Sequence, residues 1–148
     1  MKSLNDGNRV FDGNRAEECY HELGHMVAMF EHGIRVEAVE VGDGFGRTRV
    51  PTQDVDALGF IVAMCAGRSA VNMWHGYKTP DDDAWHKSKD HGHAYQAALK
   101  VSKGDHKAAL LLMTWAERMA DSLVEAHWHE LHESARLLAE RGTLRVAR

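Results

Sequence analysis

The sequence lacks several features that would assign it to a common class of protein. Its formal net charge is −4, from 18 basic and 22 acidic side chains in 148 residues. It therefore has no excess of positive charge to attract nucleic acid or anionic lipid. No apolar run approaches the roughly 20 residues that span a bilayer, and residues 1–15 lack the apolar core of a signal peptide. We expect a cytoplasmic protein that binds neither nucleic acid nor membrane.

Cysteine is scarce, and one common nucleotide-binding motif is missing. The two cysteines, Cys19 and Cys65, fall within helical patterns, which favours reduced, packed thiols over a disulfide. The chain has no G-x-x-x-x-G-K-[ST] motif, so it cannot hydrolyse ATP by the P-loop route. Histidine is the unusual component, with 11 copies.

The apolar pattern predicts a mainly helical α+β fold with a small β-sheet. Residues 1–14 are polar and contain two glycines, so we expect a flexible arm there and a single domain over 15–148. The alternation in "IRVEAVEV", followed by "GDGFG" and "RTRVP", predicts two short strands joined by a turn. Helical spacing and capping signals predict helices over 15–32, about 55–74, from Thr79 and Pro80 onward, and over 106–140.

For three side chains in these helices the sequence predicts what each one contacts. Met119, like most of the methionines, falls at an apolar helical position and is expected in the core. Trp115 is expected to fill a contact between helices. Arg68 lies in a nearly all-apolar helix, so it must find a carboxylate or backbone carbonyls.

The segment "CYHELGHMVAMF" contains the strongest chemical signal. On a helix His21 and His25 project from one face, one turn apart, and two imidazoles so placed can bind one zinc ion. Glu22 lies about 100° around the helix, close enough to act on a water bound there. This H-E-x-x-H arrangement is the one that zinc peptidases use. Chance gives only about 0.06 such matches in a chain of this composition, so we expect a zinc site with Glu22 as general base.

The third zinc ligand is less clear from the residues themselves. Catalytic zinc sites have three protein ligands and an open position. Glu117, in "ERMAD", could serve in a zincin with a downstream glutamate. Asp81, Asp82 and Asp83, in "TPDDDAW", are the other candidates, although acids also favour a helix N-terminus through the dipole alone. Spacing does not choose between the two places.

The chain resembles the peptidase domain of the FtsH family of zinc proteases over most of its length. "CYHELGHMVA" is similar to that family's "AYHEAGHA", and "CAGRSAVNMWHG" to its "LAGRAAEELVFG". "TPDDDAW" lies where the family has the Asn-Asp-Leu segment that supplies its third ligand. "WHELHESARLLAERGTL" resembles the family's terminal helix. The resemblance implies zinc ligands His21, His25 and Asp83, with Asp82 as the rival, and Glu22 as the catalytic base.

The resemblance also implies a function. A zinc metalloendopeptidase of this kind would cut flexible or unfolded polypeptides, with substrate backbone pairing to an edge strand near 46–50. Without an ATPase module it would work alone or with a separate unfoldase or FtsH-like partner, and a homo-oligomer is a further expectation. The alternative is a non-catalytic, zinc-binding FtsH-like interaction or regulatory protein. The intact Glu22 favours the enzyme.

Overall fold

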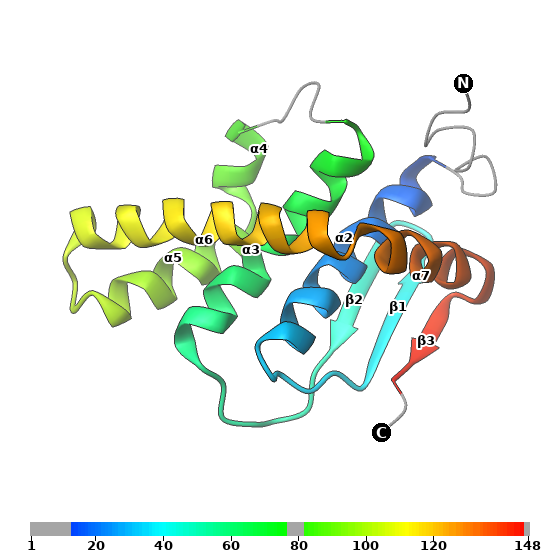
Figure 1. Cartoon of the computed structure of the whole chain (residues 1–148), viewed down its shortest axis with the longest axis horizontal. Helices are drawn as coiled ribbons and strands as arrows, with labels where there is room; N and C mark the ends of the chain where they lie inside the picture. The colour runs from blue at the N-terminus through cyan, green and yellow to red at the C-terminus, as the bar shows by residue number, and fades with distance from the viewer. Residues whose placement is uncertain (1–12, 77–81, 147–148) are drawn as a thin grey trace.

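The computed structural model describes residues 13–76 and 82–146. Within this part the chain is mainly helical with one small sheet, as predicted (Figure 1). Of the arm expected over residues 1–14, residues 1–12 lie outside the described residues, as does the expected helix start at Thr79 and Pro80. Residues 13 and 14 are helical, so the helix predicted over 15–32 begins two residues earlier than predicted. The helices are α2 (Gly13–Glu31), α3 (Ala57–Trp74), α4 (Asp82–Lys87), α5 (Lys89–Val101), α6 (His106–Ala126) and α7 (Trp128–Arg141).

The sheet has three antiparallel strands in the order β2-β1-β3. Strands β1 (Ala38–Gly42) and β2 (Phe45–Arg49) form the predicted hairpin, in which Gly44 has the positive φ of 75° that a tight turn requires. Strand β3 (Thr143–Arg145) pairs with the other edge of β1 and was not predicted. Strand β2 is therefore an edge strand, and it lies against α2.

Helix α3 passes through the middle of the molecule and packs against α2, α5 and α6. Its N-terminus is capped by Asp56, whose side chain accepts a hydrogen bond from the Gly59 amide at 2.9 Å. By length and composition alone α3 could cross a membrane, a weak sign because a core helix passes the same test. Half of that stretch is buried inside the molecule.

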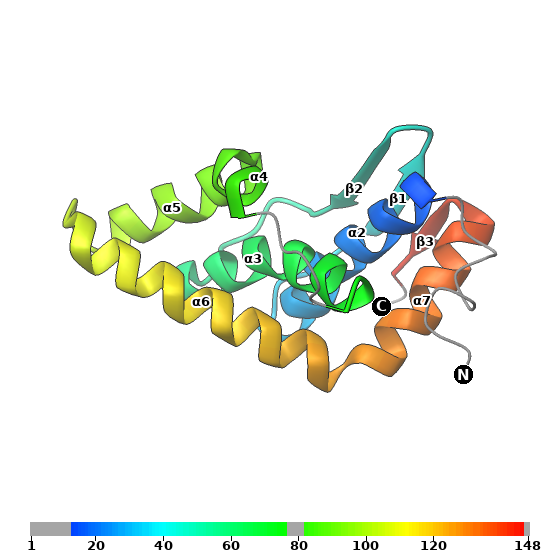
Figure 2. The same cartoon turned by 90° about the horizontal axis from the view of Figure 1, so that it is seen from above.

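Two of the predicted helices are interrupted. Ser88 separates α4 from α5, and its hydroxyl caps α5 by accepting from the His91 amide at 3.1 Å. His127 separates α6 from α7, so the segment predicted as one helix over 106–140 bends there. Helices α4 and α5 lie on one side of the molecule, the sheet and α7 lie on the other, and α2 and α3 run between them (Figure 2).

Candidate metal centre

Helix α2 presents the H-E-x-x-H residues toward α3, and glycines let the two helices approach closely. A Cβ atom on Gly24 would lie 2.3 Å from the Ala66 carbonyl oxygen of α3. A Cβ atom on Gly67 of α3 would lie 2.7 Å from two atoms of the His25 ring and 3.0 Å from the His21 ring. Only glycine leaves room at these two positions, so the backbone of α3 forms a wall against both imidazoles.

The two histidines converge with an aspartate that the sequence reasoning did not select. The Nε2 atoms of His21 and His25 are 3.1 Å apart. Asp90 Oδ2 lies 2.9 Å from the first and 3.0 Å from the second. Three ligands of a tetrahedral zinc ion at about 2.0–2.1 Å would lie about 3.3 Å from one another. The observed triangle therefore needs only a slight expansion to hold zinc.

Hydrogen bonding leaves one ring nitrogen of His25 able to coordinate a metal. Its Nδ1–H donates to the Ala63 carbonyl oxygen at 2.7 Å, which leaves Nε2 with a lone pair in the neutral ring. That lone pair faces the Asp90 carboxylate, which is also an acceptor. Two acceptors at 3.0 Å require a positive species between or beside them, either a proton or a metal ion.

The electrostatics of the cluster favour positive charge. Burial by itself lowers the pKa of His25, but the hydrogen bond and the negative charge of Asp90 outweigh it and raise that pKa above its ordinary value. Burial likewise raises the pKa of Asp90, yet the hydrogen bonds with His21 and His25 hold it well below its usual range. The carboxylate thus stays ionised against the two imidazoles, as a metal ligand must.

The structure does not bring the predicted third ligand to the histidines, and Asp90 takes that place. Asp83 lies in the first turn of α4 with its side chain 88% exposed, 3.7 Å from Lys87 Nζ. Its rival Asp82 forms an ion pair with Arg68. Both acids serve the start of α4, where the helix dipole favours them. Asp81 lies outside the described residues.

Glu117, the remaining candidate, is also engaged elsewhere. Its carboxylate accepts a hydrogen bond from Trp85 Nε1 at 2.9 Å. Trp85 in turn lies under the Arg68 guanidinium, 5.2 Å from ring centroid to Cζ. Arg68 therefore has its predicted carboxylate in Asp82, together with an aromatic face.

A signal for Asp90 is present in the sequence. Ser88 is a favourable N-cap, and a helix that begins there carries Asp90 in its first turn. Ala94 and Ala98 follow at intervals of four residues and are fully buried, so Asp90 lies on the face of α5 that packs inward.

Glu22 lies beside the cluster and is held by the sheet. Its side chain is buried, and the Thr48 hydroxyl donates to its Oε1 atom at 2.9 Å and also lies 3.2 Å from its backbone carbonyl. Thr48 belongs to edge strand β2, so the hairpin positions the glutamate. Gly46 of the same strand faces it as well, because a Cβ atom there would lie 3.0 Å from Glu22 Cγ.

The cluster opens into a cavity of about 900 Å³. Its walls come from α2, α3, α4, α5 and β2, and the lining residues include His21, Glu22, Asp90, Arg68 and Gly46. Such a volume is typical of a binding site. His25 is buried behind His21, so a ligand would reach the centre from the side of His21 and Asp90.

A scan against models of protein families finds none that matches the chain, and a search of curated proteins finds no match. The resemblance to the FtsH family stays a prediction. The chemistry of the centre is therefore inferred from its own residues.

Proposed function

We propose that the protein is a zinc-dependent peptidase whose metal is held by His21, His25 and Asp90. The convergence of two imidazole Nε2 atoms and one carboxylate oxygen, all 2.9–3.1 Å apart, is the observation that carries the proposal. Two nitrogen ligands and one oxygen ligand suit zinc, whereas magnesium and calcium take oxygen ligands throughout. Three ligands beside an open cavity match the donor set of a catalytic zinc site.

Zinc at this place would polarise a carbonyl group and lower the pKa of a water molecule. Glu22 would act as the general base, taking a proton from the attacking water and passing it to the leaving amide nitrogen. Thr48 supports this role because its hydrogen bond fixes the direction of the carboxylate. The bond from His25 Nδ1 to the Ala63 carbonyl fixes the ring that would hold the metal.

The substrate is proposed to be an extended polypeptide. Strand β2 pairs with β1 through one edge, and it has no strand partner on the other edge within the described chain. An extended segment can add to such an edge by main-chain hydrogen bonds. Because Gly46 and Thr48 adjoin Glu22, a peptide on this strand would run past the base. A folded protein exposes few such segments, which favours flexible or unfolded substrates.

Replacement of Glu22 by Gln tests the enzymatic role. The change keeps the size of the side chain and leaves the three proposed ligands in place, so zinc content should stay at one per chain. A positioned base contributes about 10²–10⁴-fold to rate, and cleavage of a denatured, fluorescently labelled protein should fall by that factor. Glu140→Gln, at an exposed glutamate of α7, is the matched control and should retain full activity.

Two results would overturn the proposal. One is equal cleavage by the wild type and the Glu22→Gln variant, which would trace the activity to another source. The other is wild-type protein that carries zinc yet cuts no unfolded polypeptide, which would support a zinc-binding interaction protein instead.

A further inference from the structure

Glu18 lines the same cavity as the candidate centre, one helical turn before the proposed base Glu22. Residues four apart project from the same side of a helix, so both carboxylates lie toward strand β2. A Cβ atom on Gly46 of that strand would lie 3.1 Å from Glu18 Oε2 and 3.3 Å from Glu22 Oε2. The two carboxylates therefore approach one point on the edge strand that is proposed to bind substrate.

The carboxylates on this wall of the cavity differ in what already binds them. Glu22 is buried and accepts a hydrogen bond from Thr48 at 2.9 Å. Glu17 pairs with His75 at 3.3 Å. Glu18 is only partly buried, and it forms no ion pair with any other residue that the structure describes. Glu18 is thus the carboxylate on this wall that can accept a group from the substrate.

The surroundings of Glu18 favour a positively charged partner. Burial raises the pKa of Glu18 above its ordinary value, the charge of His21 opposes this effect, and the charges of Glu22 and Glu17 add to it. The ionised carboxylate is therefore less well stabilised here than in water. A cation beside it would supply the missing stabilisation.

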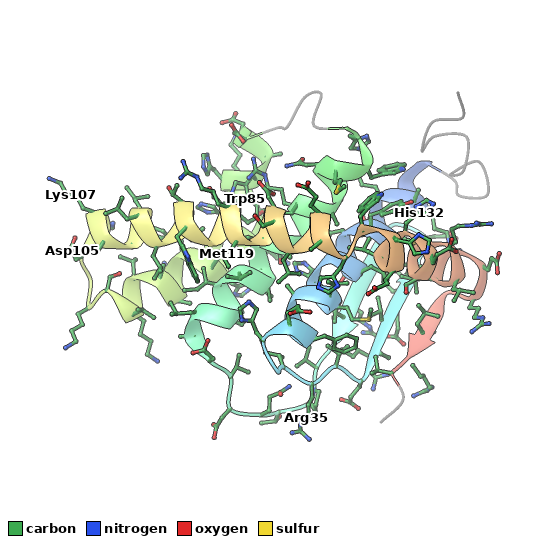
Figure 3. The ribbon with its side chains drawn as sticks, viewed as in Figure 1. Arg35, Trp85, Asp105, Lys107, Met119 and His132 are labelled. Carbon is green, nitrogen blue, oxygen red and sulfur yellow. The ribbon has the colours of Figure 1, made fainter. Side chains whose placement is uncertain are left out.

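The cationic groups of the cavity do not supply that partner. Arg68 of α3 is paired with Asp82 and lies over the ring of Trp85 on α4 (Figure 3). Lys89 begins α5 and is not among the groups that act on the pKa of Glu18. Bound zinc would not neutralise this wall either, because the charges of Asp90 and Glu22 balance its own.

We infer that the centre prefers polypeptides with a lysine or arginine next to the scissile bond, and that Glu18 selects this residue; the inference rests on the proposed function. A peptide added to β2 would place one side chain about 4.5–5.5 Å from the Cβ position of Gly46, on the side of α2. From there a lysine or arginine can reach Glu18 Oε2 and form a charge-assisted hydrogen bond. The bond lies next to the scissile bond because Glu22 approaches the same point.

Other side chains at this place would bind less well. An aspartate or glutamate would lie against the like charge of Glu18, which disfavours binding. A neutral side chain would remove water from the carboxylate without replacing the hydrogen bonds that the water made. The selection therefore comes both from attraction of the basic side chain and from the cost of the alternatives.

Peptide binding to the zinc-loaded Glu22→Gln protein tests the selection without cleavage. The labelled peptides share one uncharged sequence and differ only in a central lysine, glutamine or glutamate, and fluorescence anisotropy gives each dissociation constant. The lysine peptide should bind about tenfold more tightly than the glutamine peptide, as expected of one hydrogen bond between charged groups. Glu18→Gln, added in the same background, should bring this ratio to about one.

Glu125→Gln is the matched control. Glu125 is an exposed residue of α6 that does not line the cavity, and its replacement removes the same charge from a chain whose net charge is −4. The tenfold ratio should persist in this variant. Equal loss of the ratio in both variants would trace it to overall charge and would overturn the inference. Metal analysis and a thermal melt verify that each variant keeps its zinc and its fold.

Cleavage sites separate this inference from the proposed function on which it rests. Mass spectrometry of a denatured protein cut by the wild type should show lysine and arginine enriched next to the cut bonds, and Glu18→Gln should lose that enrichment. Cleavage that depends on Glu22 but shows no such enrichment would overturn the selection and leave the peptidase standing. A protein that cuts nothing, yet binds the lysine peptide through Glu18, would overturn the peptidase and leave the selection standing.

Discussion

Gly67→Ala should weaken zinc binding at the proposed site, although Gly67 is not itself a proposed ligand. The added methyl group would lie 2.7 Å from the Cε1 and Nε2 atoms of His25 and 3.0 Å from His21 Cε1. An ordinary contact is at least 3.4 Å, so the rings would have to retreat by about 0.7 Å. Metal–ligand distances tolerate only about 0.2 Å. We expect the dissociation constant for zinc to rise about 10–100-fold, the usual effect of disturbing the groups that hold the ligands.

Gly67→Ala should change the free energy of unfolding of the metal-free protein only modestly, because two opposing effects partly cancel. Alanine in place of a mid-helix glycine gains about 1 kcal/mol, while overpacking costs about 1–3 kcal/mol. Metal-free Gly67→Ala should therefore be at most about 2 kcal/mol less stable. At a free zinc concentration 100 times the wild-type dissociation constant, the wild type gains about 2.7 kcal/mol from zinc. The variant, with a dissociation constant about 10–100 times higher, should gain only about 0.4–1.4 kcal/mol.

The assay combines a zinc titration against a chromogenic chelator with urea unfolding, each with and without zinc. Gly92→Ala is the matched control, because it is also a helical glycine and a Cβ atom there meets nothing within 4 Å. It should bind zinc normally and be stabilised by about 0.5–1 kcal/mol. If Gly67→Ala bound zinc within twofold of the wild type, the imidazoles would not lie against α3 as described.

Three further predictions concern the centre and the core. Asp90→Ala should abolish stoichiometric zinc binding while Asp83→Ala leaves it unchanged, as measured by metal analysis after dialysis; the reverse result would restore the sequence-based choice. Thr48→Val should keep the zinc and lower peptide cleavage up to about tenfold, since one hydrogen bond to the general base contributes about 0.5–1.5 kcal/mol; an unchanged kcat/KM would show that this bond does not position the base. Burial raises the pKa of the Cys19 and Cys65 thiols to about 12, so at pH 8 only about one thiol in 10⁴ is ionised. Thiol labelling of the native protein should thus be at least about 1,000-fold slower than in denaturant, and rapid native labelling would contradict the burial.

The elements that the sequence predicts correctly are those whose signals lie in the neighbouring residues of the chain. The H-E-x-x-H helix follows from apolar spacing, and its end follows from Gly33, which has a φ of 71°. The hairpin follows from alternation on either side of a Gly-containing turn. Each of these signals lies within a few residues of the structure it specifies.

The parts that sequence did not predict depend on distant partners. Strand β3 is three residues long, and only its pairing with β1, about one hundred residues earlier, makes it a strand. Asp90 meets His21 across 69 positions, through the packing of α5 on α3. Trp115, predicted to fill a contact between helices, and Met119, predicted in the core, are 38% and 40% exposed. Periodicity identifies an apolar position on a helix but not what covers it.

The order of strands in the sheet also sets when the fold can be completed. Strand β1 emerges early in synthesis, and one of its edges has no strand partner until β3 follows. Roughly one hundred residues lie between them, which at about 5–20 residues per second takes about 5–20 s to translate. During that interval the nascent chain exposes an unpaired edge that could bind a neighbouring chain. The growing hairpin would therefore be open to pairing with a neighbouring chain for longer when translation is slower.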